Sequence, residues 1–156
     1  MAHVPQIVQY EDRYEAQVLA LAREMHAESV SHKDMPLDEV KLLGQLKASH
    51  TLPDTVYFKL CVRNDEVLGG FFGQISGVYF GSAKAAKDLA WFVKRNHRGS
   101  IAALLLVADF EAWGVSHGVK DFFLGQSTGV NIETTRALYE HLGYTVVGVN
   151  TRKRIG

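Results

Sequence analysis

The stretch of sequence that decides the fold is DLAWFVKRNHRGSIAALLL, residues 88–106. An apolar segment that predicts a strand over 88–95 runs into a short basic turn, and an aliphatic segment that predicts a helix over 100–117 follows at once. The first N–H groups of a helix lack partners inside it and lie at the positive end of its dipole, so they can hold phosphate groups. Gly99 lets the backbone approach closely and Arg98 adds charge, so we predict a pyrophosphate-binding turn.

This stretch resembles the signature segment of the GNAT superfamily of acetyl-CoA-dependent N-acyltransferases. That segment is a strand ending in valine, a basic connection, and Arg/Gln-x-x-Gly-x-Gly/Ala leading into an aliphatic helix. Val93, Arg98 and Ala103 stand at matching offsets and Gly99 directly follows Arg98, whereas Ile101 stands where the pattern has a glycine. A helix-start amide at this position therefore meets the pyrophosphate beside a branched side chain, which backbone N–H groups allow when that side chain points away.

A second segment, TRALYEHLGY over residues 135–144, resembles the family's helix "x-LY-x-x-x-GF" that precedes a final strand. The two segments occur in the order that the family requires, with room between them for a helix, a strand and a loop. Two matches in the right order make the resemblance far more specific than one.

We predict an α/β fold in a single domain over residues 1–156: a GNAT-like mixed central sheet of about six strands, with helices on both faces and the order β-α-α-β-β-β-α-β-α-β. Periodicity and turn residues place the strands at 4–9, 55–62, 67–80, 88–95, 121–125 and 144–150, and the helices at 10–30, 36–49, 100–117 and 132–142. Residues 81–87 are expected to form a polar loop. The glycines within 67–80 indicate either room for a ligand or simple strand distortion.

The third predicted helix is apolar over much of its length, so its buried face has to be chosen from the spacing. We expect a buried stripe formed by Ile101, Leu104, Leu105, Ala108 and Trp113.

Composition excludes several classes of protein. The 17 basic residues balance 17 acidic ones, so no overall charge favours nucleic acid or an anionic membrane surface. The single cysteine, Cys61, lies in an alternating apolar segment and is expected to be a buried thiol. No histidine pair has metal-ligand spacing, and the chemistry needs no metal. Without a signal-peptide pattern or a long apolar run, we expect a cytoplasmic protein.

Acyl transfer to an amine needs a bound thioester, a deprotonated nitrogen and help for the departing thiolate. The resemblance implies that Tyr139 lies beside the thioester sulfur as general acid; a core tyrosine is the alternative interpretation. Asp88 is the first candidate for the general base, although a solvated strand-edge carboxylate is the commoner role. The expected cofactor-binding residues are Phe92, Val93, Arg98, Gly99, Ser100, Ile101, Ala102, Ala103 and Asn131.

The resemblance therefore implies an N-acetyltransferase in which a primary amine attacks acetyl-CoA directly in a ternary complex, with no metal. The alternative is a non-catalytic GNAT-like module that binds CoA or a protein partner. A small-molecule or peptide amine is expected as acceptor, and polyamines, aminoglycosides, amino acids and protein amines are all compatible. We expect no nucleic-acid or membrane partner, and a homodimer through a sheet edge or the last strands is a reasonable guess.

Overall fold

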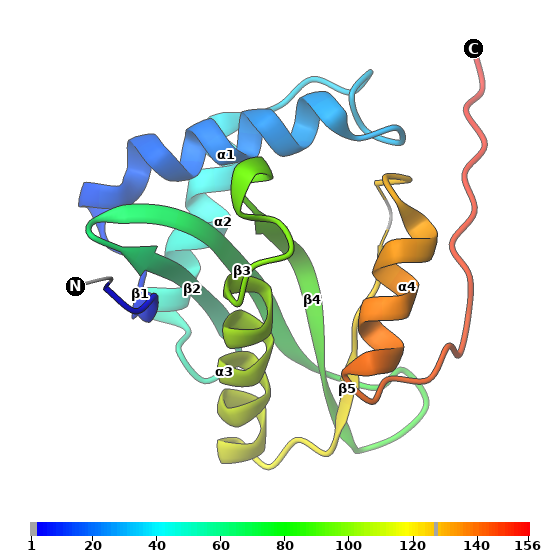
Figure 1. Ribbon diagram of the computed structural model, residues 1–156. Coiled ribbons are helices and arrows are strands. Elements are labelled where there is room, and N and C mark those ends of the chain that lie inside the picture. The colour runs from blue at the N-terminus through cyan, green and yellow to red at the C-terminus, as the bar shows by residue number, and fades with distance from the viewer. Residues whose placement is uncertain (1–2, 127) are drawn as a thin grey trace.

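The computed structural model describes residues 3–126 and 128–156 and has a mixed five-stranded sheet in the order β1-β2-β3-β4-β5 (Figure 1). The first four strands pair antiparallel, and β5 runs parallel to β4. The strands are β1 (Gln6–Gln9), β2 (Val56–Arg63), β3 (Glu66–Gly77), β4 (Lys84–Val93) and β5 (Asp121–Phe123). The predicted α/β class is confirmed, with five strands in the described residues where about six were expected.

The helices are α1 (Glu15–Glu28), α2 (Glu39–Thr51), α3 (Ala102–Ser116) and α4 (Ile132–His141), with short 3₁₀ turns η1 (Asp12–Tyr14) and η2 (Arg95–His97). One apolar core lies between the sheet and α3 and centres on Phe71, Leu106 and Phe110. A second core lies between the opposite face of the sheet and the first two helices, and contains Val18 and Leu46. The helices therefore cover both faces of the sheet, as predicted (Figure 1).

Close packing accounts for two of the glycines of β3, Gly70 and Gly73. A Cβ on Gly73 would come within 2.6 Å of the Phe110 ring, and one on Gly70 within 2.9 Å of the Phe92 ring. Real Cβ atoms do not approach so closely, so each glycine lets an aromatic ring lie flat on the sheet. The pairing register with β4 also shifts at Gly73, which agrees with strand distortion as one of the two interpretations at that residue.

The strand β4 begins earlier than predicted and carries a bulge. Residues 84–87, expected in a loop, pair with β3, and three of them also pair with β5: Ala85 with Asp121, Ala86 with Phe122 and Lys87 with Phe123. Pairing with β3 shifts between Phe72 and Gly73, so Leu89 has no partner of its own. The loop prediction was wrong because two small residues, Ala85 and Ala86, stand where larger apolar residues usually mark a strand; both are fully buried, and Ala86 packs in the α3 core.

The predicted last strand, 144–150, is not a strand in the structure. Residues 144–156 follow α4 as an extended segment that pairs with no described strand (Figure 1). Its apolar side chains are exposed, with Val147 78% and Val149 87% accessible. The alternation that favoured a strand is present, but the segment has no neighbour in this chain to which its backbone could bond.

The face of α3 that enters the core differs from the one predicted. Ile101 and Leu104 are exposed, whereas Ala102, Leu106, Val107, Phe110 and Gly114 are buried. Because α3 is apolar on nearly all sides, periodicity could not distinguish the buried side. Gly114 is buried because Phe122 of β5 packs against it, within 2.4 Å of where a Cβ would lie.

Candidate functional site

The sheet splits between β4 and β5, and this split forms the candidate site. The two strands pair only from Ala85 to Lys87, after which β5 ends and β4 continues to Val93 with one edge open. Lys94 donates its N–H to the Leu68 carbonyl of β3. Since neighbouring residues of a strand point their backbone groups to opposite sides, Val93 directs its N–H and C=O to the open edge. An extended ligand could pair with this edge as a further strand would.

The turn before α3 lies at the end of this open edge. Gly99 has a φ of +81°, a conformation that favours glycine, and it lets the chain reverse between η2 and the helix. The Ser100 hydroxyl accepts the Ala102 N–H at 3.3 Å. The next two N–H groups of the helix, on Ala103 and Leu104, have no intrahelical acceptor at their positions.

Ile101 does not obstruct this turn. Its side chain is 54% exposed, whereas that of the next residue, Ala102, is fully buried. The branched side chain therefore points into solvent and leaves the helix start accessible. The first turn of α3 retains the dipole and the unpaired donors that bind anions.

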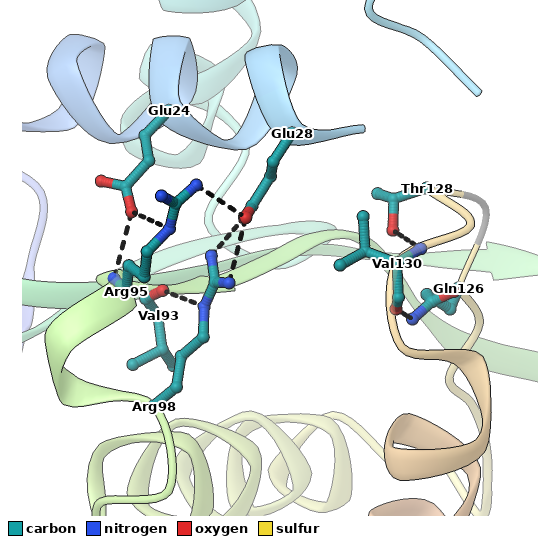
Figure 2. A network of polar contacts seen from close by, with 8 residues as sticks. All are labelled: Glu24, Glu28, Val93, Arg95, Arg98, Gln126, Thr128 and Val130. Atoms are coloured by element: carbon teal, nitrogen blue, oxygen red, sulfur yellow. Dashed lines mark hydrogen bonds and ion pairs between the residues drawn. The ribbon is translucent and has the colours of Figure 1, made fainter. Parts of the chain in front are cut away.

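Arg98 is held by ion pairs to the last residue of α1 (Figure 2). Its guanidinium forks onto the Glu28 carboxylate, with Nη1 3.1 Å from Oε2, and its Nε donates to the Val93 carbonyl at 3.2 Å. Arg95 also reaches Glu28 at 3.3 Å and donates its backbone N–H to Glu24. The paired arginine lowers the pKa of Glu28, which therefore stays ionised.

Asp88 and Tyr139, predicted from separate segments, meet at the backbone of Gly125. The Gly125 N–H donates to Asp88 Oδ1 at 3.0 Å, and the Tyr139 hydroxyl donates to the Gly125 carbonyl at 2.9 Å. The Tyr139 ring also stacks on Trp91 of β4, with centroids 5.8 Å apart and planes 16° apart. The structure therefore brings the two predicted catalytic residues together beside the split.

Burial changes the acidity of both groups. It raises the pKa of Asp88 to about 6, against the opposing effect of the Gly125 N–H, which stabilises the carboxylate. It also raises the pKa of Tyr139, and the charge of Asp88 adds to this. Near neutral pH, Asp88 is mainly a carboxylate that can take a proton, and Tyr139 is a phenol that keeps one.

Three buried side-chain atoms lack hydrogen-bond partners among the described residues: Nε1 of Trp91, Oε1 of Gln126 and the hydroxyl oxygen of Tyr144. The ring centroid of Tyr144 lies 6.4 Å from that of Tyr139, and Gln126 follows Gly125. Most buried polar groups in folded proteins are paired, so orphans gathered around one point suggest that a polar ligand belongs there.

Two further residues predicted to bind the cofactor, Phe92 and Asn131, have other arrangements in the structure. The carbonyl of Phe92 faces β3, within 2.6 Å of where a Cβ on Gly69 would lie, so Phe92 turns this group away from the open edge. Asn131 precedes α4 in a left-handed conformation with a φ of 47°, and its side chain makes no capping bond to the helix. The burial of Cys61 in the α3 core agrees with its predicted structural role.

Sequence reasoning missed Glu28, Gly125 and Trp91. A carboxylate in the last turn of a helix opposes the helix dipole, and Glu28 has this position in the predicted first helix. That placement could have indicated a cationic partner. No local signal marked Gly125 or Trp91, because their roles depend on how β4, β5 and α4 meet.

A cavity of about 1270 Å³ lies between α4 and the C-terminal segment. Tyr139 and Tyr144 line it, together with residues of the loop after α1, but the Arg98 turn does not. Among residues 3–126 and 128–156, no group of three or more metal-ligating side chains comes together. No helix in that part of the chain is long and apolar enough to cross a membrane.

In sequence the chain matches no family model and no curated protein. In structure it is similar to a Trypanosoma brucei acetyltransferase (17% identity, 97% of this chain and 100% of the other, TM-score 0.72). It is also similar to AAC(6')-Iy, solved with the bisubstrate analogue CoA-S-monomethyl-acetylneamine (15% identity, 97% of this chain and 99% of the other, TM-score 0.76). A third similar structure is glucosamine-6-phosphate N-acetyltransferase from Arabidopsis thaliana (13%, 98% and 99%, 0.75).

The chain has the GNAT acetyltransferase fold. The similarity extends over nearly all of both chains. At identities of 13–17% it shows the fold alone. Activity has to be argued from the residues of this chain.

Proposed function

We propose that this protein is an N-acetyltransferase that moves an acetyl group from acetyl-CoA to a primary amine by direct attack in a ternary complex. The observation that carries the proposal is the open edge of β4, from Asp88 to Val93, which ends at the N-terminal turn of α3. Acetyl-CoA has an extended amide-bearing arm and a pyrophosphate. An open strand edge suits the arm and a helix N-terminus suits the pyrophosphate, so the residues present fit this cosubstrate.

Asp88 is the proposed general base. An alkylammonium group must lose a proton before or as its nitrogen attacks the thioester carbonyl. A carboxylate with a pKa of about 6 is ionised near neutral pH, yet it is a stronger base than an exposed aspartate. Asp88 lies beside Gly125, where the open edge of β4 begins. The proposed base and the Arg98 turn are therefore at opposite ends of this edge.

Tyr139 is the proposed donor to the departing thiolate. Its raised pKa keeps the hydroxyl protonated, so it is available to donate. It now donates to the Gly125 carbonyl, 2.9 Å away, and would exchange that partner for the sulfur as the C–S bond breaks. Stacking on Trp91 fixes the ring while the hydroxyl changes partner.

The proposed acceptor is a primary amine carried by a small molecule or a peptide. One similar structure is named as a glucosamine-6-phosphate N-acetyltransferase, and another was solved with a bisubstrate analogue that joins CoA to acetylneamine. These names support an amine acceptor as a class. They leave the identity of the acceptor in this protein to an activity screen.

Calorimetry with CoA tests the cofactor assignment, and the chain offers a matched pair of glycines. Gly99 and Gly118 have φ values of +81° and +79°, and a Cβ on either would meet no atom within 4 Å. Gly99→Val and Gly118→Val therefore impose similar backbone strain at opposite ends of α3. We expect CoA affinity to fall only in Gly99→Val; an equal fall in both variants, or in neither, contradicts the assignment.

The alternative is a module of the same fold that binds CoA without turnover. The bond from Tyr139 to Gly125 favours this alternative, because it gives the hydroxyl a structural partner. CoA binding combined with no thiol release from acetyl-CoA across a broad set of amines would support the module over the enzyme.

We also propose that two copies of this protein associate through the free edge of β5. Within the described chain β5 is the last strand of the sheet, and an exposed edge readily pairs with another strand. The C-terminal segment carries exposed Val147 and Val149, which a partner copy would cover. Light scattering on the purified protein, with Val149→Lys as the variant expected to weaken association, tests this.

A further inference from the structure

The Glu28 carboxylate lies where an anionic ligand of Arg98 would be expected. It is only 19% exposed, and it takes both terminal nitrogens of the guanidinium, while the Val93 carbonyl takes Nε. A forked carboxylate uses the same pair of donors that a phosphate oxygen pair would use. The arginine that is best placed to bind a pyrophosphate therefore already holds an anion from its own chain (Figure 2).

The charges around this contact cancel. Arg95 and Arg98 are matched by Glu24 and Glu28, and the backbone C-terminus of α1 adds the negative end of a helix dipole. A pyrophosphate approaching this side of the turn thus meets two carboxylates as well as two guanidinium groups. The favourable field that the basic turn predicts from sequence is largely neutralised.

The end of α1 also contacts the opposite side of the split. Ser31 donates its N–H to the Thr128 carbonyl at 3.1 Å, and the Ser29 hydroxyl reaches the same oxygen at 3.5 Å. Residues 28–31 therefore bind both the turn after β4 and the loop before α4. Removing the Glu28 contact would leave this segment attached through the loop alone.

We propose that Glu28 is a built-in competitor for the cofactor, whose carboxylate must leave Arg98 before the pyrophosphate of acetyl-CoA can bind there. The inference rests on the proposed function, because it takes the turn at residues 98–103 as the pyrophosphate site. Binding exchanges one anion for another on a single guanidinium. Glu28 thereby sets the cofactor affinity below what the turn and Arg98 would provide without it.

The test measures CoA dissociation constants by calorimetry for the parent, Glu28→Gln and Glu24→Gln. Glu28→Gln should bind CoA about threefold to tenfold more tightly, because a partly exposed ion pair no longer has to be broken. Glu24→Gln removes a neighbouring charge that contacts Arg95 but not Arg98, so its affinity should change by less than about twofold. Unchanged or weaker binding by Glu28→Gln overturns the inference.

A double variant separates competition for Arg98 from a general charge effect. In an Arg98→Ala background, Glu28→Gln should give no gain in CoA affinity, and an equal gain in that background overturns the inference. CoA binding by none of the proteins contradicts the proposed function itself. CoA binding without a gain in Glu28→Gln contradicts only the competition.

Hydrogen exchange on the parent protein gives a readout that needs no substitution. Release of Glu28 should increase amide exchange over residues 28–31 when CoA is added. Increased protection of that segment would mean that Glu28 stays bound to Arg98 in the complex, and would overturn the inference even if Glu28→Gln failed to fold.

Discussion

The helices α3 and α4 lie on the same side of the sheet, yet they are held very differently. Five residues of α3 are buried, among them Leu106 and Phe110 at full burial. No residue of α4 is buried, and its ring contacts include Tyr139 on Trp91 and on Tyr144. Packing of the core positions α3, whereas a few contacts at the candidate site position α4.

This difference means that the proposed site joins a firmly packed part of the molecule to a loosely held one. The turn at Gly99 and the base candidate Asp88 belong to the packed part, through α3 and β4. Tyr139 belongs to the loosely held part, and the bond that orients its hydroxyl also helps to attach the helix. Loss of chemistry and loss of attachment therefore have to be separated by experiment.

Tyr139→Phe is expected to have the largest effect. Loss of a general acid should lower kcat about 10²–10⁴-fold, while the KM for acetyl-CoA changes little. Loss of the hydroxyl bond to Gly125 should reduce the free energy of unfolding by only about 1 kcal/mol, because the stacked ring remains. CoA thiol release on an accepted amine measures the first effect and urea unfolding the second. Turnover equal to the parent would make the hydroxyl purely structural.

Truncations in the two parts test the packing difference directly. Phe110→Ala should lower the free energy of unfolding by about 3–5 kcal/mol, since the ring is fully buried and stacks on Phe71 at 4.2 Å. Leu142→Ala, after α4, should cost only about 1–2 kcal/mol, because that side chain is half-buried. Denaturant midpoints measured on both variants give the comparison. Equal losses would show that the C-terminal part is packed as firmly as the rest.

Asp88→Asn is expected to stabilise the protein near neutral pH. The folded-state pKa of about 6 exceeds the ordinary 3.8, so the folded state binds more protons than the unfolded state between these values. Stability of the parent should therefore fall as pH rises from about 4 to about 6, and the variant should be about 1–3 kcal/mol more stable at pH 7. Melting temperatures across this range check it. A parent whose stability rises over the same window would contradict the burial of the carboxylate.

The pH dependence of turnover should also depend on the ionisation of Asp88. If Asp88 accepts the proton, activity of the parent rises through about pH 6, and Asp88→Asn loses that step. A variant that keeps the parent's pH profile would assign the base elsewhere.

Arg98→Ala should give the smallest change, about a fivefold to tenfold rise in the apparent constant for acetyl-CoA with less than a twofold change in turnover. Arg98 would contact the phosphate equally in the ground and transition states, so its loss affects cofactor binding more than turnover. The loss in acetyl-CoA affinity stays small because Arg98 must first give up its ion pair with Glu28. Initial rates at varied acetyl-CoA measure both constants. A large fall in turnover alone would place Arg98 at the reacting centre.

Local sequence signals predicted most of the fold. Apolar periodicity and glycine stops located α1 to α4 and most strands, and the Val93–Ala103 segment placed the turn before α3 correctly. What failed depended on distant partners. Ala85 and Ala86 are strand residues because they pair with β5 and because Ala86 packs in the α3 core, and residues 144–150 are not a strand because nothing in the described chain pairs with them.

The candidate site was predictable in its residue types and not in its connections. Asp88 and Tyr139 were found from spacing and resemblance, but their meeting at Gly125 depends on where β5 ends. The contact between Glu28 and Arg98 joins positions 70 residues apart. No pattern within a single segment encodes such a pair, although the unfavourable dipole at Glu28 hints at it.

The unpaired Leu89 decides which side of β4 carries the chemistry. Side chains alternate along a strand, so residue 88 would ordinarily share a face with residues 90 and 92, which look toward α1 and α2. One extra residue inverts the count, and Asp88 instead faces the Trp91 side, where Tyr139 lies. Deleting Leu89 would turn the Asp88 carboxylate to the opposite side of the sheet. The bulge thus acts as a one-residue insertion in β4, and this single insertion determines on which face of the sheet the Asp88 carboxylate lies.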